Sequence, residues 1–374
     1  MKELKNIISA IEKLKNTNEI AIATLVKVSG STYRSPGARM LISADGNSIG
    51  SISGGCLESD VFEKAQTVIK SENPRLIKYD TTSEEDMIWG LGLGCQGIAY
   101  VLIEPLQENK LQEITFIEKC LSNRTYGAIA TVIIVEGETT TQIGQRLLLG
   151  EDTIINNLTD DNLLTEVLSD TKAALQNNQC ILKEYNLASV KIEVFIEVIQ
   201  PPLSLIVFGA GYDVIPLVNF SKQLGWDVTV VDNRQREATK KRFEQADKIL
   251  LSPPEEILEN IEITERTVAV VMSHNYLDDL EMLKLLVPSN LIYLGILGPK
   301  KRTNRILKEL QEEGITANAN MYSPVGLDIG ADNAEEIALS IVAEIQAVIS
   351  HRDAGFLKNR NAPIHAKEEL ATDN

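Results

Sequence analysis

Residues 203–232 read LSLIVFGAGYDVIPLVNFSKQLGWDVTVVD. The apolar run at the start predicts a buried strand, and Gly209 and Gly211 predict a tight turn where backbone can approach a pyrophosphate. A helix and a second strand follow, and Asp232 stands directly after that strand, where we expect it to bond a ribose hydroxyl. Strand, glycine turn, helix, strand and terminal acid together predict the first half of a Rossmann (dinucleotide-binding) fold.

Two further strands are predicted downstream, at 267–272 and 291–296, and each leads into a polar loop. Ligands of parallel sheets bind at the carboxyl ends of strands, so His274 and Lys300 are candidate site residues. His274 is interpreted either as an acid–base group or as a structural histidine. Lys300 is interpreted either as a phosphate contact or as the solvated start of a helix.

The half of the chain before the Rossmann segment contains an internal repeat. Residues 21–42 and 128–149 align without a gap at an offset of 107 and share ten identities. The order of the helices and strands that follow also agrees, which predicts a duplicated unit. We therefore expect an α/β protein, with an N-terminal mixed α/β domain containing a pseudo-repeat and a C-terminal Rossmann-like parallel-sheet domain. The expected boundaries are 1–107 for the first copy, 108–202 for a degenerate second copy packed with it, 203–350 for the Rossmann-like domain and 351–374 for a polar tail.

Two glycine-flanked cysteines distinguish the first copy from the second. Cys56 follows Gly54 and Gly55, and Cys95 follows Gly94, while the second copy has nothing similar. By the last strand the offset has fallen from 107 to 93, so the second copy lacks 107 − 93 = 14 residues around Cys95. A scaffold that folds without these loops does not need them for folding. We therefore interpret both cysteines as functional thiols, with two small buried residues beside tight turns as the alternative.

The segment around Cys56 is also expected to bind an anion. Apolar residues at helical spacing predict a helix that begins at Cys56, and the free N–H groups of a helix N-terminus favour a thiolate or a bound anion. Arg34 and Arg39 lie on the preceding turn, and guanidinium groups suit phosphate. Because Arg146 repeats Arg39 in the second copy, a structural role is an alternative for Arg39, and Arg34 is favoured as the anion contact.

Composition limits the classes of function. The 374 residues carry a formal net charge of −17, which argues against a nucleic-acid-binding surface. No apolar run approaches the ~20 residues of a membrane span, so no membrane association is expected. The four cysteines form neither a disulfide framework nor zinc-ligand spacing. We expect a cytoplasmic protein with reduced thiols.

Short motifs in a characteristic order resemble the XdhC/CoxI family, the accessory proteins that mature xanthine dehydrogenase-type molybdenum hydroxylases. The resemblance covers roughly residues 10 to 350, and its motifs are Gly37-Ala38-Arg39-Met40, Gly50-Ser51-Ile52-Ser53-Gly54-Gly55-Cys56, Gly92-Leu93-Gly94-Cys95, Phe208-Gly209-Ala210-Gly211, Met272-Ser273-His274 and Pro324-Val325-Gly326-Leu327-Asp328-Ile329-Gly330-Ala331.

The resemblance implies a chaperone that binds molybdenum cofactor (molybdopterin), a molybdenum-bearing pterin with a phosphate. It implies further that the protein supports sulfuration of the cofactor by a cysteine desulfurase, delivers it to an apo xanthine dehydrogenase-type enzyme, and forms a homodimer. The family's motif cysteines correspond to Cys56 and Cys95, which makes them candidates for sulfur handling and for contact with molybdenum. Asp328, in the last motif, joins the candidate cofactor-binding residues.

Two alternatives come from other classes of function. The Rossmann-like half is also compatible with an NAD(P)-dependent oxidoreductase in which His274 is the acid–base residue and Cys56 a redox thiol. A nucleotide-sensing scaffold that docks partners is the other. In each case we expect the ligand between the two domains, with both cysteines facing the loops of Gly211, His274 and Lys300.

Overall fold

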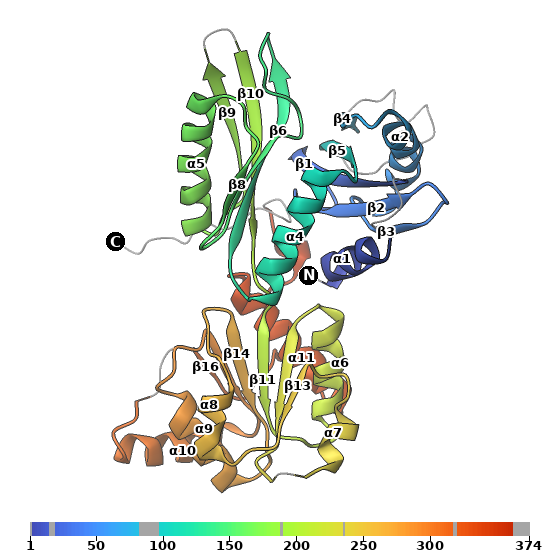
Figure 1. The fold of residues 1–374 in the computed structure, drawn as a ribbon. Helices are drawn as coiled ribbons and strands as arrows, with labels where there is room; N and C mark the ends of the chain where they lie inside the picture. Colours follow the sequence, from blue (N-terminus) through green and yellow to red (C-terminus); the bar gives the residue numbers. More distant parts are fainter. Residues whose placement is uncertain are drawn as a thin grey trace. The chain divides into compact units, whose positions relative to one another are not determined.

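The chain divides into two compact units. The structure is a computed structural model that describes residues 2–14, 19–81, 97–187, 190–234, 236–316 and 320–361 (Figure 1). The N-terminal unit is Glu3–Pro201, and the C-terminal unit comprises Met1–Lys2 and Pro202–Asn374. Among the described residues, no helix is both long and apolar enough to cross a membrane.

The N-terminal unit contains two five-stranded antiparallel sheets with the same strand order. The first, β3-β2-β1-β5-β4, consists of β1 (Ile20–Gly30), β2 (Arg39–Ser43), β3 (Ser48–Gly50), β4 (Arg75–Asp80) and β5 (Gly97–Pro105). The second, β8-β7-β6-β10-β9, consists of β6 (Gly127–Glu136), β7 (Arg146–Leu149), β8 (Ile154–Asn156), β9 (Ile181–Leu187) and β10 (Val190–Ile199). The first copy also holds α1 (Lys2–Leu14) and α2 (Glu58–Ser71), and the second holds α4 (Glu108–Ser122) and α5 (Asp161–Gln176). The matching order confirms the predicted pseudo-repeat.

The two sheets pack against each other at equivalent positions. In β1 the register against β5 shifts at Val26, and in β6 the register against β10 shifts at Ile133, which is 107 residues further on. The side chains at these two shifts, Val26 and Ile133, are buried in one cluster with Leu102 of β5 and Phe195 of β10. Each copy therefore contributes the same pair of positions to the contact, as in a pseudo-symmetric dimer.

Buried ion pairs cross between the copies. Arg39 of the first copy pairs with Glu197 of the second at 2.6 Å, and Arg146 of the second pairs with Glu104 of the first. All four side chains are at least nine-tenths buried. This reciprocal pairing explains why both copies have an arginine at this position of the repeat.

Helix α4 completes this ion network. Glu113 lies 2.8 Å from the ammonium of Lys110 and 3.3 Å from each of the guanidinium groups of Arg39 and Arg146. Lys110 also pairs with Glu104 at 2.7 Å. Three cations thus meet three carboxylates, so the buried network is neutral, as its burial requires.

The C-terminal unit is a six-stranded parallel sheet of the order β13-β12-β11-β14-β15-β16. Its strands are β11 (Ser204–Phe208), β12 (Asp227–Val231), β13 (Lys248–Leu250), β14 (Thr267–Val271), β15 (Tyr293–Ile296) and β16 (Met321–Tyr322). Numbered from the first strand of this unit, the order is 3-2-1-4-5-6, that of a Rossmann fold. The expected α/β architecture is thereby confirmed.

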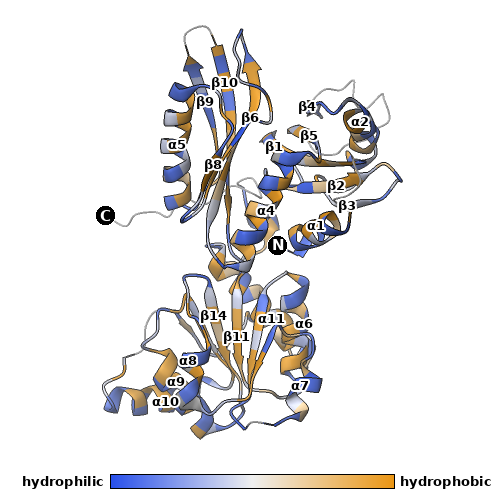
Figure 2. Ribbon diagram, in the orientation of Figure 1, coloured by the Kyte–Doolittle hydropathy of each residue, from blue (hydrophilic) through white to orange (hydrophobic). Residues whose placement is uncertain are grey.

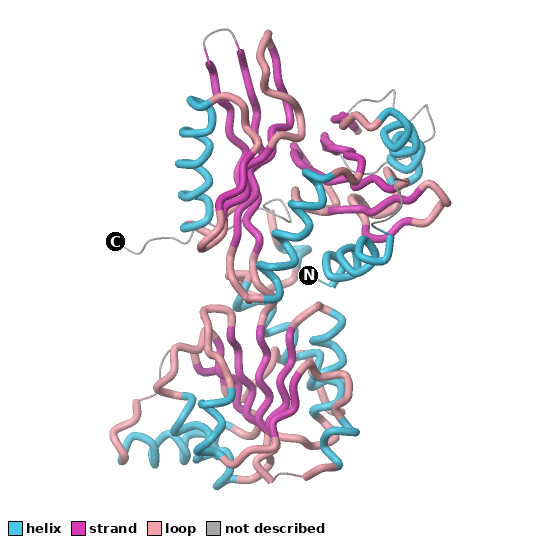
Figure 3. The backbone as a smooth tube through the Cα atoms, in the orientation of Figure 1, coloured by secondary structure: helices cyan, strands magenta, loops and turns pink. Residues whose placement is uncertain are grey.

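Helices cover both faces of the parallel sheet. They are α6 (Val214–Gln223), α7 (Ala238–Arg242), α8 (Pro254–Asn260), α9 (Tyr276–Leu286), α10 (Lys300–Glu312) and α11 (Ala334–Ile349), and a short 3-10 turn, η1 (Leu357–Asn359), follows. Leu205 and Val207 of β11 pack with α6 and α11, while Ile206 and Phe208 pack with α9 and α10. Figure 2 shows the hydrophobic strands between these helices, and Figure 3 shows loops at the strand ends. Burial of alternate residues on both faces accounts for the uninterrupted apolar run.

Candidate functional site

Cys56 lines a small pocket of the first copy. Its walls include Tyr33, Arg34, Ser53, Cys56 and Thr81, and its volume is about 40 Å³. The pocket thus combines the predicted thiol with the arginine that was favoured as its anion contact. The space admits one small group, so the body of a larger ligand would lie outside it.

The turn before α2 is organised by a glutamate that the sequence analysis did not single out. Helix α2 begins at Glu58, two residues later than predicted, and the Glu58 carboxylate accepts hydrogen bonds from the backbone N–H groups of Ile52, Ser53 and Leu57 at 2.8–3.2 Å. Burial opposes its ionisation, but hydrogen bonds from the Ser53 side chain and backbone outweigh burial and lower the pKa of Glu58. The carboxylate of Glu58 therefore uses the N–H groups of the turn before α2, and an anion site at the first turn of the helix itself stays a prediction.

Gly54 and Gly55, the two residues before Cys56, are each glycine for a different structural reason. Gly55 has a φ of +110° with open space around it, so only its backbone conformation calls for glycine. A Cβ at Gly54 would approach the ring of Tyr33 to 3.2 Å. Tyr33 is 64% exposed and lines the same pocket as Cys56. The thiol of Cys56 lies 3.5 Å from the hydroxyl of Ser53.

The two candidate arginines have different surroundings. Arg34 lines the Cys56 pocket and forms two hydrogen bonds with Glu3 of α1, at 3.0 and 3.2 Å. Arg39 is 3% exposed and belongs to the ion network between the copies. Burial lowers its pKa, but the carboxylates of Glu197 and Glu113 outweigh burial and raise it, so Arg39 stays charged within that network. This arrangement favours the structural alternative for Arg39 and leaves Arg34 as the accessible cation.

Cys95 and Gly94 lie outside the described residues. The two residues that flank this stretch, Thr81 and Gly97, both line the Cys56 pocket and are joined by a hydrogen bond from Thr81 N to Gly97 O of 3.0 Å. The described residues on either side of this stretch therefore both lie at the Cys56 pocket. Within the described ranges, no group of three or more histidine, cysteine or acidic side chains is placed to hold a metal ion.

The glycine turn of the Rossmann sheet brings two predicted residues together. Gly209 has a φ of +139°, and a Cβ there would lie 2.7 Å from the carbonyl carbon of Met272. Beside this turn, His274 at the end of β14 lies 2.6 Å from the carboxylate of Asp213. Asp213 immediately precedes α6, and a Cβ on Gly211 would collide with its carboxylate. A carboxylate that was not predicted from the sequence therefore lies beside the second glycine of the turn and pairs with His274.

Asp232 differs from its predicted role. It directly follows β12, as expected, but is 1% exposed. Its carboxylate accepts hydrogen bonds from Arg236 Nε at 3.0 Å, from the hydroxyl of Thr239 at 2.5 Å and from the backbone of Arg234 at 3.2 Å. The structure therefore gives Asp232 a role in holding the start of α7 and does not present it to a ribose.

Lys300 and Asp328 are exposed residues of the C-terminal unit. Lys300 is the first residue of α10, and Asp328 lies in the loop between β16 and α11. Both follow carboxyl ends of parallel strands, the edge at which the glycine turn and His274 also lie. That this edge faces the Cys56 pocket across a cleft stays a prediction.

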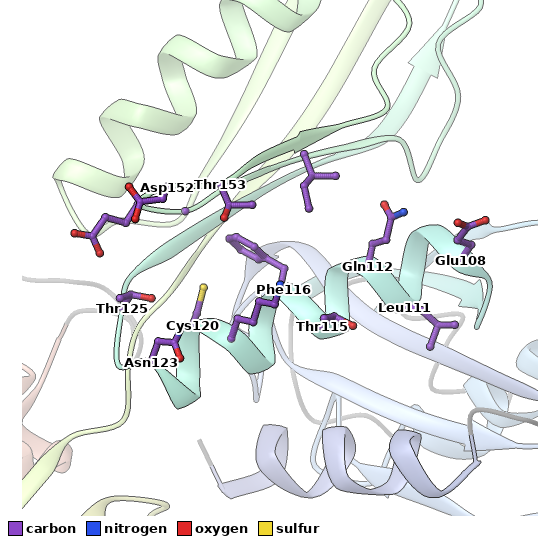
Figure 4. Close-up of a pocket in the computed structure, with 14 residues that line it drawn as sticks. Glu108, Leu111, Gln112, Thr115, Phe116, Cys120, Asn123, Thr125, Asp152 and Thr153 are labelled. Atoms are coloured by element: carbon purple, nitrogen blue, oxygen red, sulfur yellow. The ribbon is translucent and has the colours of Figure 1, made fainter.

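A second cavity of the N-terminal unit, of about 370 Å³, lies between α4 and the turn that joins β7 to β8 (Figure 4). Phe116 and Cys120 of α4 contribute its apolar wall. Burial raises the pKa of Cys120 to about 11, so its thiol is protonated and unreactive at neutral pH. The thiol in this cavity is therefore not a candidate nucleophile.

Family models and individual relatives of this chain point to the same group of proteins. A model of the XdhC and CoxI family matches residues 14–80, and a model of the XdhC Rossmann domain matches residues 205–345. A relative from Bacillus subtilis, described as a probable xanthine dehydrogenase subunit, is 36% identical over 334 residues, 89% of this chain and 94% of the relative. The molybdenum cofactor insertion chaperone PaoD of Escherichia coli is 21% identical over 346 residues, 92% of this chain and 88% of the relative.

A solved structure agrees over nearly the whole length. The crystal structure of a xanthine dehydrogenase from Bacillus halodurans is 32% identical, covers 94% of this chain and 98% of its own, and superposes with a TM-score of 0.75. Together with the two-sheet N-terminal unit and its Cys56 turn, these matches show that the chain belongs to the XdhC and CoxI family.

Proposed function

We propose that this protein is an accessory chaperone of molybdenum hydroxylases. In this proposal it binds molybdenum cofactor at the Cys56 pocket, supports its sulfuration by a cysteine desulfurase and passes it to an apo xanthine dehydrogenase-type enzyme. The observation that carries the proposal is the asymmetry of the repeat. Cys56, its glycine turn and the inserted segment occur only in the first copy, although both copies build the same sheet. The names of the relatives support the same molybdenum chemistry.

The donor groups of the pocket fit this cofactor chemically. A thiolate is a soft ligand suited to molybdenum or to carrying sulfur, so Cys56 would hold the metal or sulfur end. Arg34 would contact the phosphate, and the exposed ring of Tyr33 would cover a face of the pterin. When bound, the cofactor supplies the redox-active molybdenum of the client enzyme. Glu58 contributes indirectly, because its hydrogen bonds hold the turn that presents the thiol.

Two features weigh against the oxidoreductase alternative. Asp232 is buried against Arg236 and Thr239, and Asp213 lies at the start of α6, where a pyrophosphate would be repelled. His274, paired with Asp213, has a local partner that needs no bound nucleotide. A homodimer and a role for Cys95 in sulfur handling remain part of the chaperone proposal.

Replacing Cys56 by alanine is expected to reduce retained cofactor at least about tenfold, because the proposed metal or sulfur contact is lost. The protein is purified from a molybdenum-replete host, and bound pterin is measured by fluorescence after oxidation, with molybdenum measured by mass spectrometry. Cys180→Ala, which removes an exposed cysteine of the second copy, is the matched control. Equal retention by Cys56→Ala and Cys180→Ala, or none by the wild type under loading with released cofactor, would count against the proposal. Transfer into the apoenzyme then separates delivery from storage.

A further inference from the structure

We propose that Glu3 of α1 is a built-in competitor for the anionic group of the ligand at the Cys56 pocket. Arg34 recognises a phosphate or another oxyanion there, and Glu3 neutralises Arg34 until such a group displaces it. This inference rests on the proposed function for the location of the ligand but concerns charge selection, which the proposed function does not address.

The geometry of the pair resembles that of an arginine holding an oxyanion. Arg34 donates from Nη1 to Glu3 Oε2 at 3.2 Å and from Nη2 to Glu3 Oε1 at 3.0 Å. A carboxylate that accepts both bonds of the guanidinium fork occupies the sites that a phosphate would use. Since Arg34 also lines the pocket with Cys56, an anion that replaces Glu3 lies beside the thiol.

Exposure makes this pair exchangeable. The side chains of Arg34 and Glu3 are 32% and 33% exposed, and ion pairs in contact with water contribute little to stability. Arg39 provides the contrast, because it is 3% exposed and tied to two glutamates of the buried network. Of these two arginines, Arg34 is the one that can change partners without disrupting the contact between the copies.

The second copy shows that the pair is not part of the common scaffold. At the offset of 107, Lys110 stands where Glu3 would be repeated and Thr141 where Arg34 would be. Lys110 is used in the buried network, and Thr141 is buried. The Arg34–Glu3 pair thus accompanies Cys56, the glycine turn and the inserted segment, all of which are confined to the first copy.

Two alkylating reagents of nearly equal size test the proposal directly. Iodoacetate is an anion and iodoacetamide is neutral, and with both the thiolate of Cys56 forms an S–C bond as the C–I bond breaks and iodide leaves. The ratio of their rates at Cys56, measured by mass spectrometry of the Cys56 peptide, cancels any change in the thiolate fraction. The ratio therefore reports the charge that the reagent meets in the pocket.

Glu3→Gln is expected to raise the iodoacetate-to-iodoacetamide ratio about two- to fivefold, because Arg34 loses its counter-charge. Arg34→Met is expected to lower the ratio below that of the wild type, and the double variant should show no rise. Glu12→Gln, an exposed glutamate on the same helix, removes the same charge and should leave the ratio unchanged. Inorganic phosphate should slow iodoacetate more in Glu3→Gln than in the wild type.

An equal ratio in Glu3→Gln and Glu12→Gln overturns the proposal, as does a rise in Glu3→Gln that persists without Arg34. Since no cofactor is present, these outcomes are independent of cofactor retention by Cys56→Ala. The charge-selection proposal and the chaperone proposal can therefore fail separately.

Discussion

Replacing Glu113 by glutamine is expected to lower the free energy of unfolding of the N-terminal unit by about 3–5 kcal/mol at neutral pH. The carboxylate of Glu113 is 2% exposed and lies within 3.3 Å of Lys110, Arg39 and Arg146. Its loss leaves three buried cations with two carboxylates, and an unpaired buried charge is costly. Urea denaturation followed by circular dichroism measures the effect, with Glu118→Gln on the same helix as the control.

The effect of this substitution should depend on pH. Burial raises the pKa of Glu113, but the charges of Lys110, Arg146 and Arg39 outweigh burial and hold it well below its ordinary value. A carboxyl whose pKa is depressed in the folded state contributes stability that is complete above the unfolded pKa, about 4.3, and declines as pH falls below it. The difference between wild type and Glu113→Gln should therefore be constant near neutrality and narrow below about pH 4.3. A variant as stable as Glu118→Gln at pH 7 would refute the role assigned to the network.

The second large effect is expected for Gly209→Ala, which should destabilise the C-terminal unit by about 3 kcal/mol or more. A Cβ at this position would lie 2.7 Å from the carbonyl carbon of Met272, which is backbone and cannot rotate away, and the φ of +139° is unfavourable for alanine. The fluorescence of Trp226, buried in the core of the same unit, follows unfolding in urea.

Gly314→Ala separates steric collision from backbone strain. Gly314 also has a positive φ, +83°, but a Cβ there meets no atom within 4 Å. Gly314→Ala should lower the free energy of unfolding by only about 1–2 kcal/mol, which is the strain of an alanine in the left-handed backbone conformation. Equal losses in the two variants would show that close approach of the glycine turn to β14 does not limit stability.

The fold could be predicted from short stretches of sequence because burial of a strand and repetition of a unit both leave a pattern in neighbouring residues. The apolar run at 203–208 and the identities between 21–42 and 128–149 predicted the Rossmann sheet and the repeated sheets, both of which the structure contains. The short strands β13 and β16, of three and two residues, carry too little periodicity to be predicted. His274 was placed correctly because strand ends of a parallel sheet share one edge.

The partners of charged groups were much harder to predict. Glu58 binds backbone N–H groups of the turn before α2, and Asp213 pairs with His274; neither partner was predicted from the sequence. Arg39 and Glu197 are separated by 158 residues, so nothing near Arg39 indicates its partner. Local sequence therefore identified the charged residues of the site better than it identified what each one binds.

Arg39 and Arg146 each pair with a glutamate of the other copy, and this reciprocal pairing has a consequence for the number of Cys56 pockets per chain. A symmetric dimer of single-copy chains would carry two equivalent thiol pockets, one on each protomer. Here one polypeptide provides both halves of that arrangement, and only the first half has the glycine–cysteine turn of Cys56 in its sequence. Each chain therefore offers a single Cys56 pocket, and the second half can diverge in sequence wherever it does not contact the first.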